Sequence, residues 1–101
     1  KKLRNLSKLS DEEMVNQLRT HMEDFTSPTP SVETLLHAFL PHKFVDHSHA
    51  DAILAIVDQP NAEKVCSELY GDEFGIVPYI MPGFELSLLA SNIFLSNTKV
   101  K

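Results

Sequence analysis

Hydrophobic residues recur at helical spacing in the first quarter of the chain. Ser10 precedes three acidic residues, and apolar positions then follow three or four residues apart. A serine hydroxyl and a glutamate three residues later together satisfy free N–H groups at a helix start, so we expect a capping box between Ser10 and Glu13. The pattern predicts a helix over 11–25, which the two prolines of 26–30 end.

The rest of the chain alternates between apolar stripes and short extended stretches. The stripes predict helices over 32–40, 50–57, 62–70 and 84–95. The stretches 44–49 and 74–81 are predicted as strands, the second at a sheet edge because it contains Pro78. The alternation of 98–101 is typical of a third strand at its start. This order of elements predicts an α/β or α+β fold, with a small sheet flanked by helices.

The predicted core follows from the same stripes. We expect these side chains to be largely buried: Leu35, Leu36, Phe39, Ile53, Leu54, Ile56, Leu89 and Phe94. Cys66 lies among apolar neighbours and is also expected in the core.

Composition narrows the class of protein. The 101 residues are enough for one small domain, of which we expect 1–10 to be frayed. The net charge of −5 argues against a nucleic-acid partner or an anionic membrane surface. One cysteine excludes a disulfide framework and, with no secretory signal or long apolar run, favours a cytoplasmic protein. No P-loop, Gly-x-Gly-x-x-Gly or Gly-x-Ser-x-Gly motif occurs, which disfavours nucleotide binding.

Histidine is the unusual component, because four of the five histidines fall within 37–49. On a strand, His47 and His49 would point to the same side, about 6.5–7 Å apart at Cα, and could converge on one zinc ion. The ordinary alternative is a pair of polar residues at a strand end. We expect His21 and His42 to be surface residues.

Three acidic residues accompany the histidines. Glu33 and His37 are four residues apart and share a helix face, either as a solvated pair or with Glu33 as an acid/base facing the metal. Asp46 and Asp51 flank the histidine pair, where they would either orient an imidazole or act as caps and exposed charges.

Three stretches carry a resemblance to a known family. They are PSVETLLHAFLP at 30–41, VDHSHADA at 45–52 and PYIMPG at 78–83. Together they resemble the class II aldolase/adducin family. The branch they look most like fuses an aldolase domain to a short-chain dehydrogenase, as in rhamnulose-1-phosphate aldolase/alcohol dehydrogenase. The resemblance covers about 26–101.

The resemblance implies a chemistry and a site. It implies a helix-flanked, mostly antiparallel sheet and a divalent metal, usually Zn²⁺. His47 and His49 match two of the family's three metal-binding histidines, and Glu33 matches its acid/base glutamate. The family reaction reversibly cleaves a ketose 1-phosphate, a sugar phosphate, to dihydroxyacetone phosphate and an aldehyde.

The chain departs from the family pattern in two places. The third histidine, in a His-Gly motif after the last helix, is absent, and so are the glycine-rich phosphate-binding segments that normally precede the glutamate. We therefore expect an internal fragment of an aldolase domain, inactive alone, which could form a homo-oligomer. Two alternatives remain at this point. One is a non-catalytic adducin-like interaction module, and the other is a small acidic binding module with incidental histidines.

Overall fold

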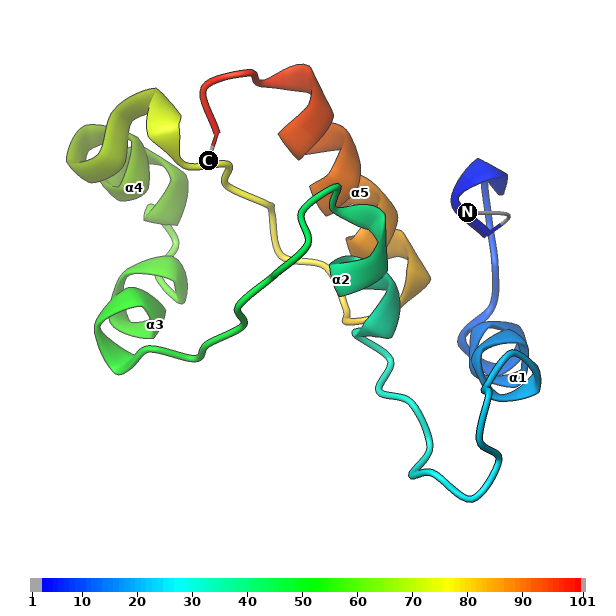
Figure 1. The fold of residues 1–101 in the computed structure, drawn as a ribbon. Coiled ribbons are helices and arrows are strands. Elements are labelled where there is room, and N and C mark those ends of the chain that lie inside the picture. Colours follow the sequence, from blue (N-terminus) through cyan, green and yellow to red (C-terminus); the bar gives the residue numbers. More distant parts are fainter. Residues whose placement is uncertain (1–2, 101) are drawn as a thin grey trace.

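The computed structural model describes residues 3–100, and every regular element in that range is a helix (Figure 1). The elements are η1 (Leu3–Asn5), α1 (Asp11–Thr20), α2 (Thr34–Phe39), α3 (Asp51–Val57), α4 (Ala62–Tyr70), η2 (Gly71–Glu73) and α5 (Phe84–Ser96). None of these helices has the length and apolar content needed to cross a lipid bilayer.

The predicted α/β fold with a helix-flanked sheet is therefore wrong. Segments 44–49 and 74–81 are irregular, and 98–100 forms a turn, while Lys101 lies outside the described residues. A strand is stable only when its N–H and C=O groups bond to a neighbouring strand. Within residues 3–100 neither segment has such a partner, and Pro78 removes one donor from the second.

Helix α1 begins as predicted and ends early. The Ser10 hydroxyl accepts a hydrogen bond from the Glu13 N–H at 3.2 Å, which confirms the N-cap. The helix stops at Thr20, whose hydroxyl bonds back to the Asn16 and Gln17 carbonyls. Beyond it the chain is irregular, and Phe25 is 90% exposed.

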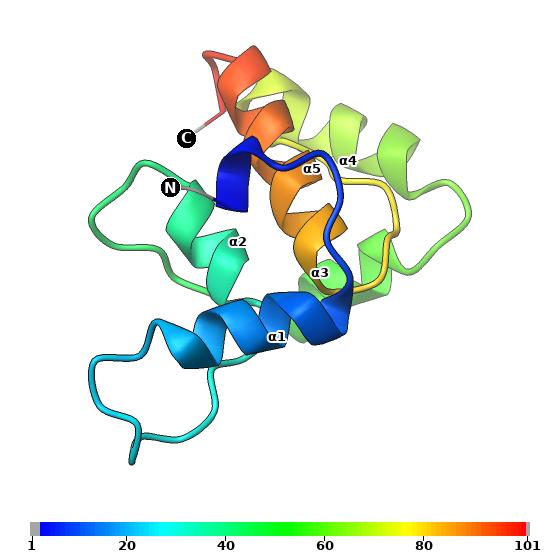
Figure 2. The same cartoon turned by 90° about the vertical axis from the view of Figure 1, so that its right-hand side faces the viewer.

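The core lies where α1, α2 and α5 meet. Its buried side chains are Met14, Leu35, Phe39 and Phe84. The Phe39 and Phe84 rings pack edge to face, with centroids 6.3 Å apart and planes at 87°. Figure 2 shows α1 running crosswise to α2 and α5. This packing fixes α2, the helix that follows Glu33.

Helix α5 shows core positions that apolar spacing did not predict. Ser87 and Ser91 are each 1% exposed and both are satisfied: Ser87 donates to the Gly83 carbonyl at 2.8 Å, and Ser91 accepts from the Arg4 guanidinium at 2.9 Å. Gly83 precedes the helix at φ 156°, where a Cβ atom would lie 2.6 Å from an Asp11 carboxylate oxygen. Phe84, which is 1% exposed, is a further buried residue that the predicted core did not include.

Helices α3 and α4 form a separate arm. Their main contacts are with each other and with η2, and Figure 1 shows them to one side of α2 and α5. The radius of gyration is 15.1 Å, against about 13 Å for a compact domain of this length. This open arrangement explains why Ile53 is 40% exposed, contrary to prediction, although Cys66 in α4 is buried as predicted.

The remaining core predictions divide in two. Leu35 and Phe39 are buried, which confirms them. The others are half-buried: Leu36, Leu54, Ile56, Leu89 and Phe94.

We predict that Phe39→Ala lowers the free energy of unfolding by about 3–5 kcal/mol, because it empties a buried site against Phe84. Urea unfolding followed by circular dichroism measures the change. Phe25→Ala removes the same ring from an exposed position and should change stability by less than about 0.5 kcal/mol. Equal losses in the two variants would contradict the described core.

The segment after α5 is tied to η2 by an ion pair. The Lys99 ammonium donates to the Asp72 carboxylate at 2.6 Å, and this hydrogen bond and the charge attraction lower the pKa of Asp72 below its ordinary value of 3.8. The pair therefore stabilises the fold above that ordinary value, and its contribution is lost as the pH falls through the lower folded pKa.

We predict that Lys99→Met raises the pKa of Asp72 toward its ordinary value, as measured by carboxyl chemical shifts in an NMR pH titration. Asp24 is the internal control, because its lowered pKa comes mainly from the Thr26 hydroxyl and should not move. An unchanged Asp72 titration would show that the pair does not form.

Candidate metal site

The start of α2 positions the Glu33 side chain. The Ser31 hydroxyl accepts from the Glu33 N–H at 3.1 Å, and the Ser31 carbonyl accepts from the Thr34 N–H at 3.0 Å. Glu33 itself occupies the N-cap position, where its carboxylate makes no capping hydrogen bond. The carboxylate instead lies next to His47, in the chain segment that follows α2.

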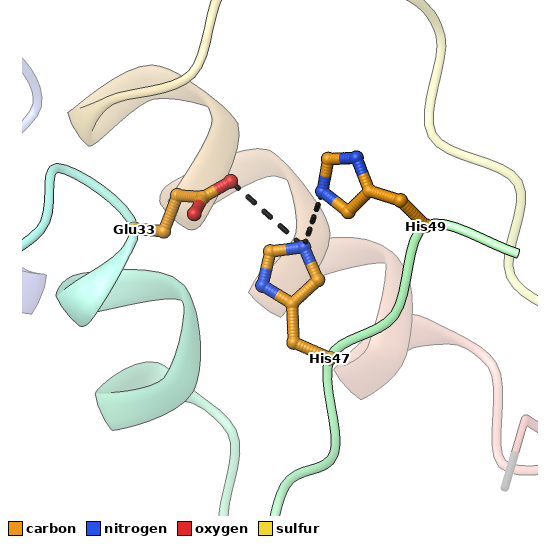
Figure 3. A group of neighbouring side chains, drawn as sticks. All are labelled: Glu33, His47 and His49. Carbon is orange, nitrogen blue, oxygen red and sulfur yellow. Dashed lines mark hydrogen bonds and ion pairs between the residues drawn. The ribbon is translucent and has the colours of Figure 1, made fainter.

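His47 and His49 come from the irregular segment 40–50, which joins α2 to α3. Their rings point to the same side, toward Glu33 (Figure 3). The two Nε2 atoms are 3.2 Å apart, and a Glu33 carboxylate oxygen lies 3.9 Å from Nε2 of His47. The expected convergence on Glu33 is present, but it arises without the predicted strand.

The three ligand atoms suit a small divalent cation. One atom each from Glu33, His47 and His49 lies within 4.8 Å of the other two. Two nitrogens bound to one tetrahedral zinc at 2.0–2.1 Å would be about 3.3–3.4 Å apart, close to the 3.2 Å between the imidazoles. Carboxylate oxygen and neutral imidazole are ordinary zinc ligands. The residues present therefore fit a zinc ion, with two nitrogen ligands and one oxygen ligand.

The site is open to solvent. About a third of the Glu33 and His47 side chains is exposed, at 33% and 32%. A groove of about 720 Å³ lies elsewhere, between α3, α4 and the segment 74–79, and none of the three residues lines it. The cluster is thus a surface site, accessible to a metal ion.

His37 of α2 lies beside the cluster. The sequence paired it with Glu33 and offered it, with His42, as a substitute third ligand only if the chain bound zinc tightly. Its Nε2 lies 3.4 Å from Nδ1 of His47, and the ring centroids are 5.5 Å apart. The sequence feature that could have predicted this contact is the position of His37 four residues after Glu33. That spacing places both side chains on the face of α2 that meets His47.

The other sequence candidates lie outside the cluster. Within residues 3–100, Asp46 and Asp51 make no hydrogen bond or ion pair with an imidazole, and Asp51 begins α3. The His42 ring packs edge-on against Phe94, and the His21 ring bonds the Gln17 carbonyl at 2.8 Å.

Comparison with known proteins finds one relative at the level of sequence. The chain is 47% identical over 89 residues to a protein of Bacillus subtilis (strain 168) named "Uncharacterized oxidoreductase YuxG". The match covers 88% of this chain and 13% of that relative, so the chain spans about an eighth of its length. This chain is therefore related to part of a protein named as an enzyme. No protein-family model and no solved structure matches the chain.

We predict that the chain binds Zn²⁺ with a dissociation constant above about 1 µM, because both imidazoles lie on an irregular segment and about a third of the Glu33 and His47 side chains is exposed, so the ligands are not held rigidly before the metal binds. Isothermal titration calorimetry measures the affinity. His47→Asn with His49→Asn should abolish binding. His21→Gln with His42→Gln removes as many histidines outside the cluster and should leave it unchanged. Binding retained after His47→Asn with His49→Asn would place the metal elsewhere.

Proposed function

We propose that this chain is the Glu33–His47–His49 portion of a metal-dependent class II aldolase, in a longer protein that cleaves a ketose 1-phosphate to dihydroxyacetone phosphate and an aldehyde. The alternative is a non-catalytic, adducin-like interaction module. One observation carries the choice: Glu33 and the histidine pair, distant in sequence, approach within metal-binding distance. A non-catalytic interaction module would not need three metal-binding side chains at this distance from one another.

The three residues have different roles in the proposed reaction. His47 and His49 would hold the metal through their Nε2 atoms, which lie 3.2 Å apart. When bound, a zinc ion supplies Lewis-acid polarisation of a carbonyl oxygen. Glu33 is the catalytic acid/base, because its carboxylate lies beside the metal position and is exposed enough to exchange a proton with substrate.

The chain is expected to be inactive alone. A catalytic zinc usually has three protein ligands and an open position. If Glu33 completes the coordination here, it is less available as a base. The chain also contributes no glycine-rich segment to hold a phosphate, since it has three glycines in all. The third histidine and the phosphate-binding groups are thus assigned to other parts of the longer protein.

The name of the relative bears on a different reaction. Aldol cleavage is not a redox reaction, so "oxidoreductase" agrees only with the dehydrogenase half of the fused branch that the sequence resembles. This chain has no Gly-x-Gly-x-x-Gly motif, and we assign it no nicotinamide-binding role.

We predict that Glu33→Gln in the longer protein lowers kcat for ketose 1-phosphate cleavage by about 10²–10⁴-fold, because the general base is lost. A coupled assay of dihydroxyacetone phosphate release measures it. Glu63→Gln is the matched control, since Glu63 is an exposed glutamate in the first turn of α4 and lies outside the cluster. A longer protein that binds zinc through His47 and His49 but cleaves no ketose 1-phosphate would overturn the aldolase proposal.

A further inference from the structure

His37 contacts the side of the His47 ring that faces away from the proposed metal. Its Nε2 lies 3.4 Å from Nδ1 of His47, whereas the Nε2 atom of His47 faces His49 at 3.2 Å. Among the described residues, the group whose ligand atoms converge contains Glu33, His47 and His49 but not His37. His37 can therefore orient the metal ligand His47, but it is not itself one of the converging metal ligands.

The chemistry of a bound imidazole requires such a partner. A metal at Nε2 uses that nitrogen's lone pair, so the proton of the neutral ring resides on Nδ1 and needs an acceptor. Within residues 3–100, Nε2 of His37 is the hydrogen-bond partner of that Nδ1. The distance of 3.4 Å is at the long end of the hydrogen-bond range. A bound cation withdraws electron density from the ring and makes its N–H a stronger donor, which favours a shorter contact.

Helix α2 thus reaches both nitrogens of one imidazole. Glu33, at its N-cap, lies 3.9 Å from Nε2 of His47, and His37, one turn later, lies 3.4 Å from Nδ1. His47 itself comes from an irregular segment, with no ladder of backbone hydrogen bonds to fix its direction. Its orientation therefore depends on side-chain contacts, and His37 is half-buried on a helix anchored in the core.

From this geometry we propose that His37 is a positioning residue: it accepts the Nδ1–H of His47 and keeps Nε2 of His47 turned toward His49 and Glu33. The inference rests on the metal site of the proposed function and adds a residue to it. It requires metal binding by the cluster, but it does not require aldolase activity.

The test measures Co²⁺ affinity of the chain by visible absorption in three variants. His37→Phe keeps a ring of similar size and removes the acceptor, and should weaken binding by about 10–100-fold. His37→Gln retains a side-chain acceptor and should recover much of the loss. His21→Gln removes a histidine outside the cluster and should match the unaltered chain. Circular dichroism verifies that each variant retains its helices.

A second readout separates positioning from general stability. In the Zn²⁺-loaded chain, ¹⁵N NMR should show a proton on Nδ1 of His47 that exchanges slowly with water. The signal should persist in His37→Gln and be lost to fast exchange in His37→Phe. Equal Co²⁺ affinity in His37→Phe and the unaltered chain, with the Nδ1–H signal retained, would overturn the role of His37 and leave the aldolase proposal standing. A folded, unaltered chain that binds no Co²⁺ at millimolar concentration would overturn the metal site and this inference together. Metal binding that depends on His37, without cleavage activity in the longer protein, would support this inference and reject the aldolase proposal alone.

Discussion

The packing of α2 against α5 is the constraint on which the rest of this structure depends. The edge-to-face contact of Phe39 with Phe84 is the centre of the buried core, and Met14 and Leu35 complete this core. Because α2 has only six residues, it would not be stable without that burial. Its N-terminal end carries Glu33, so the direction in which the carboxylate points is set by a hydrophobic contact more than a turn of helix away.

The candidate site combines one anchored side and one loosely held side. Glu33 and His37 belong to a helix that the core fixes, whereas His47 and His49 belong to an irregular segment on the surface. A metal ion would join the two sides, since its ligands come from both. This division explains why a contact such as that between His37 and His47 matters: it is a link between the two sides that does not need the metal.

The arm formed by α3 and α4 leaves large apolar side chains exposed to solvent. Its two helices contact each other, and the exposed side chains in and beside them are Ile53, Val57, Leu69 and Phe74. Apolar stripes of this kind predict burial, but burial also requires a surface to pack against. Among residues 3–100 the core formed by α1, α2 and α5 does not extend to these positions.

The sequence by itself determined the local features of this protein. Ser10 predicted the start of α1, apolar spacing predicted the helices, and Leu35 and Phe39 were correctly placed in the core. The helix start and the helices depend on neighbours within about one helical turn, which the sequence contains directly, and Leu35 and Phe39 were identified because they lie on one apolar face of such a helix. The histidine pair and Glu33 could likewise be singled out from spacing and from resemblance to a family.

Only the tertiary structure decided the features that need distant partners. Segments 44–49 and 74–81 have strand-like composition, yet they remain irregular because strand formation depends on pairing with another segment. The burial of Ser87 and Ser91 depends on what lies across from α5, and their own polarity predicted the opposite. The contact between His37 and His47 depends on how the segment 40–50 folds back past α2, and residue spacing does not predict that path. Spacing thus identified residues capable of the chemistry, and the path of the backbone determined which of them meet.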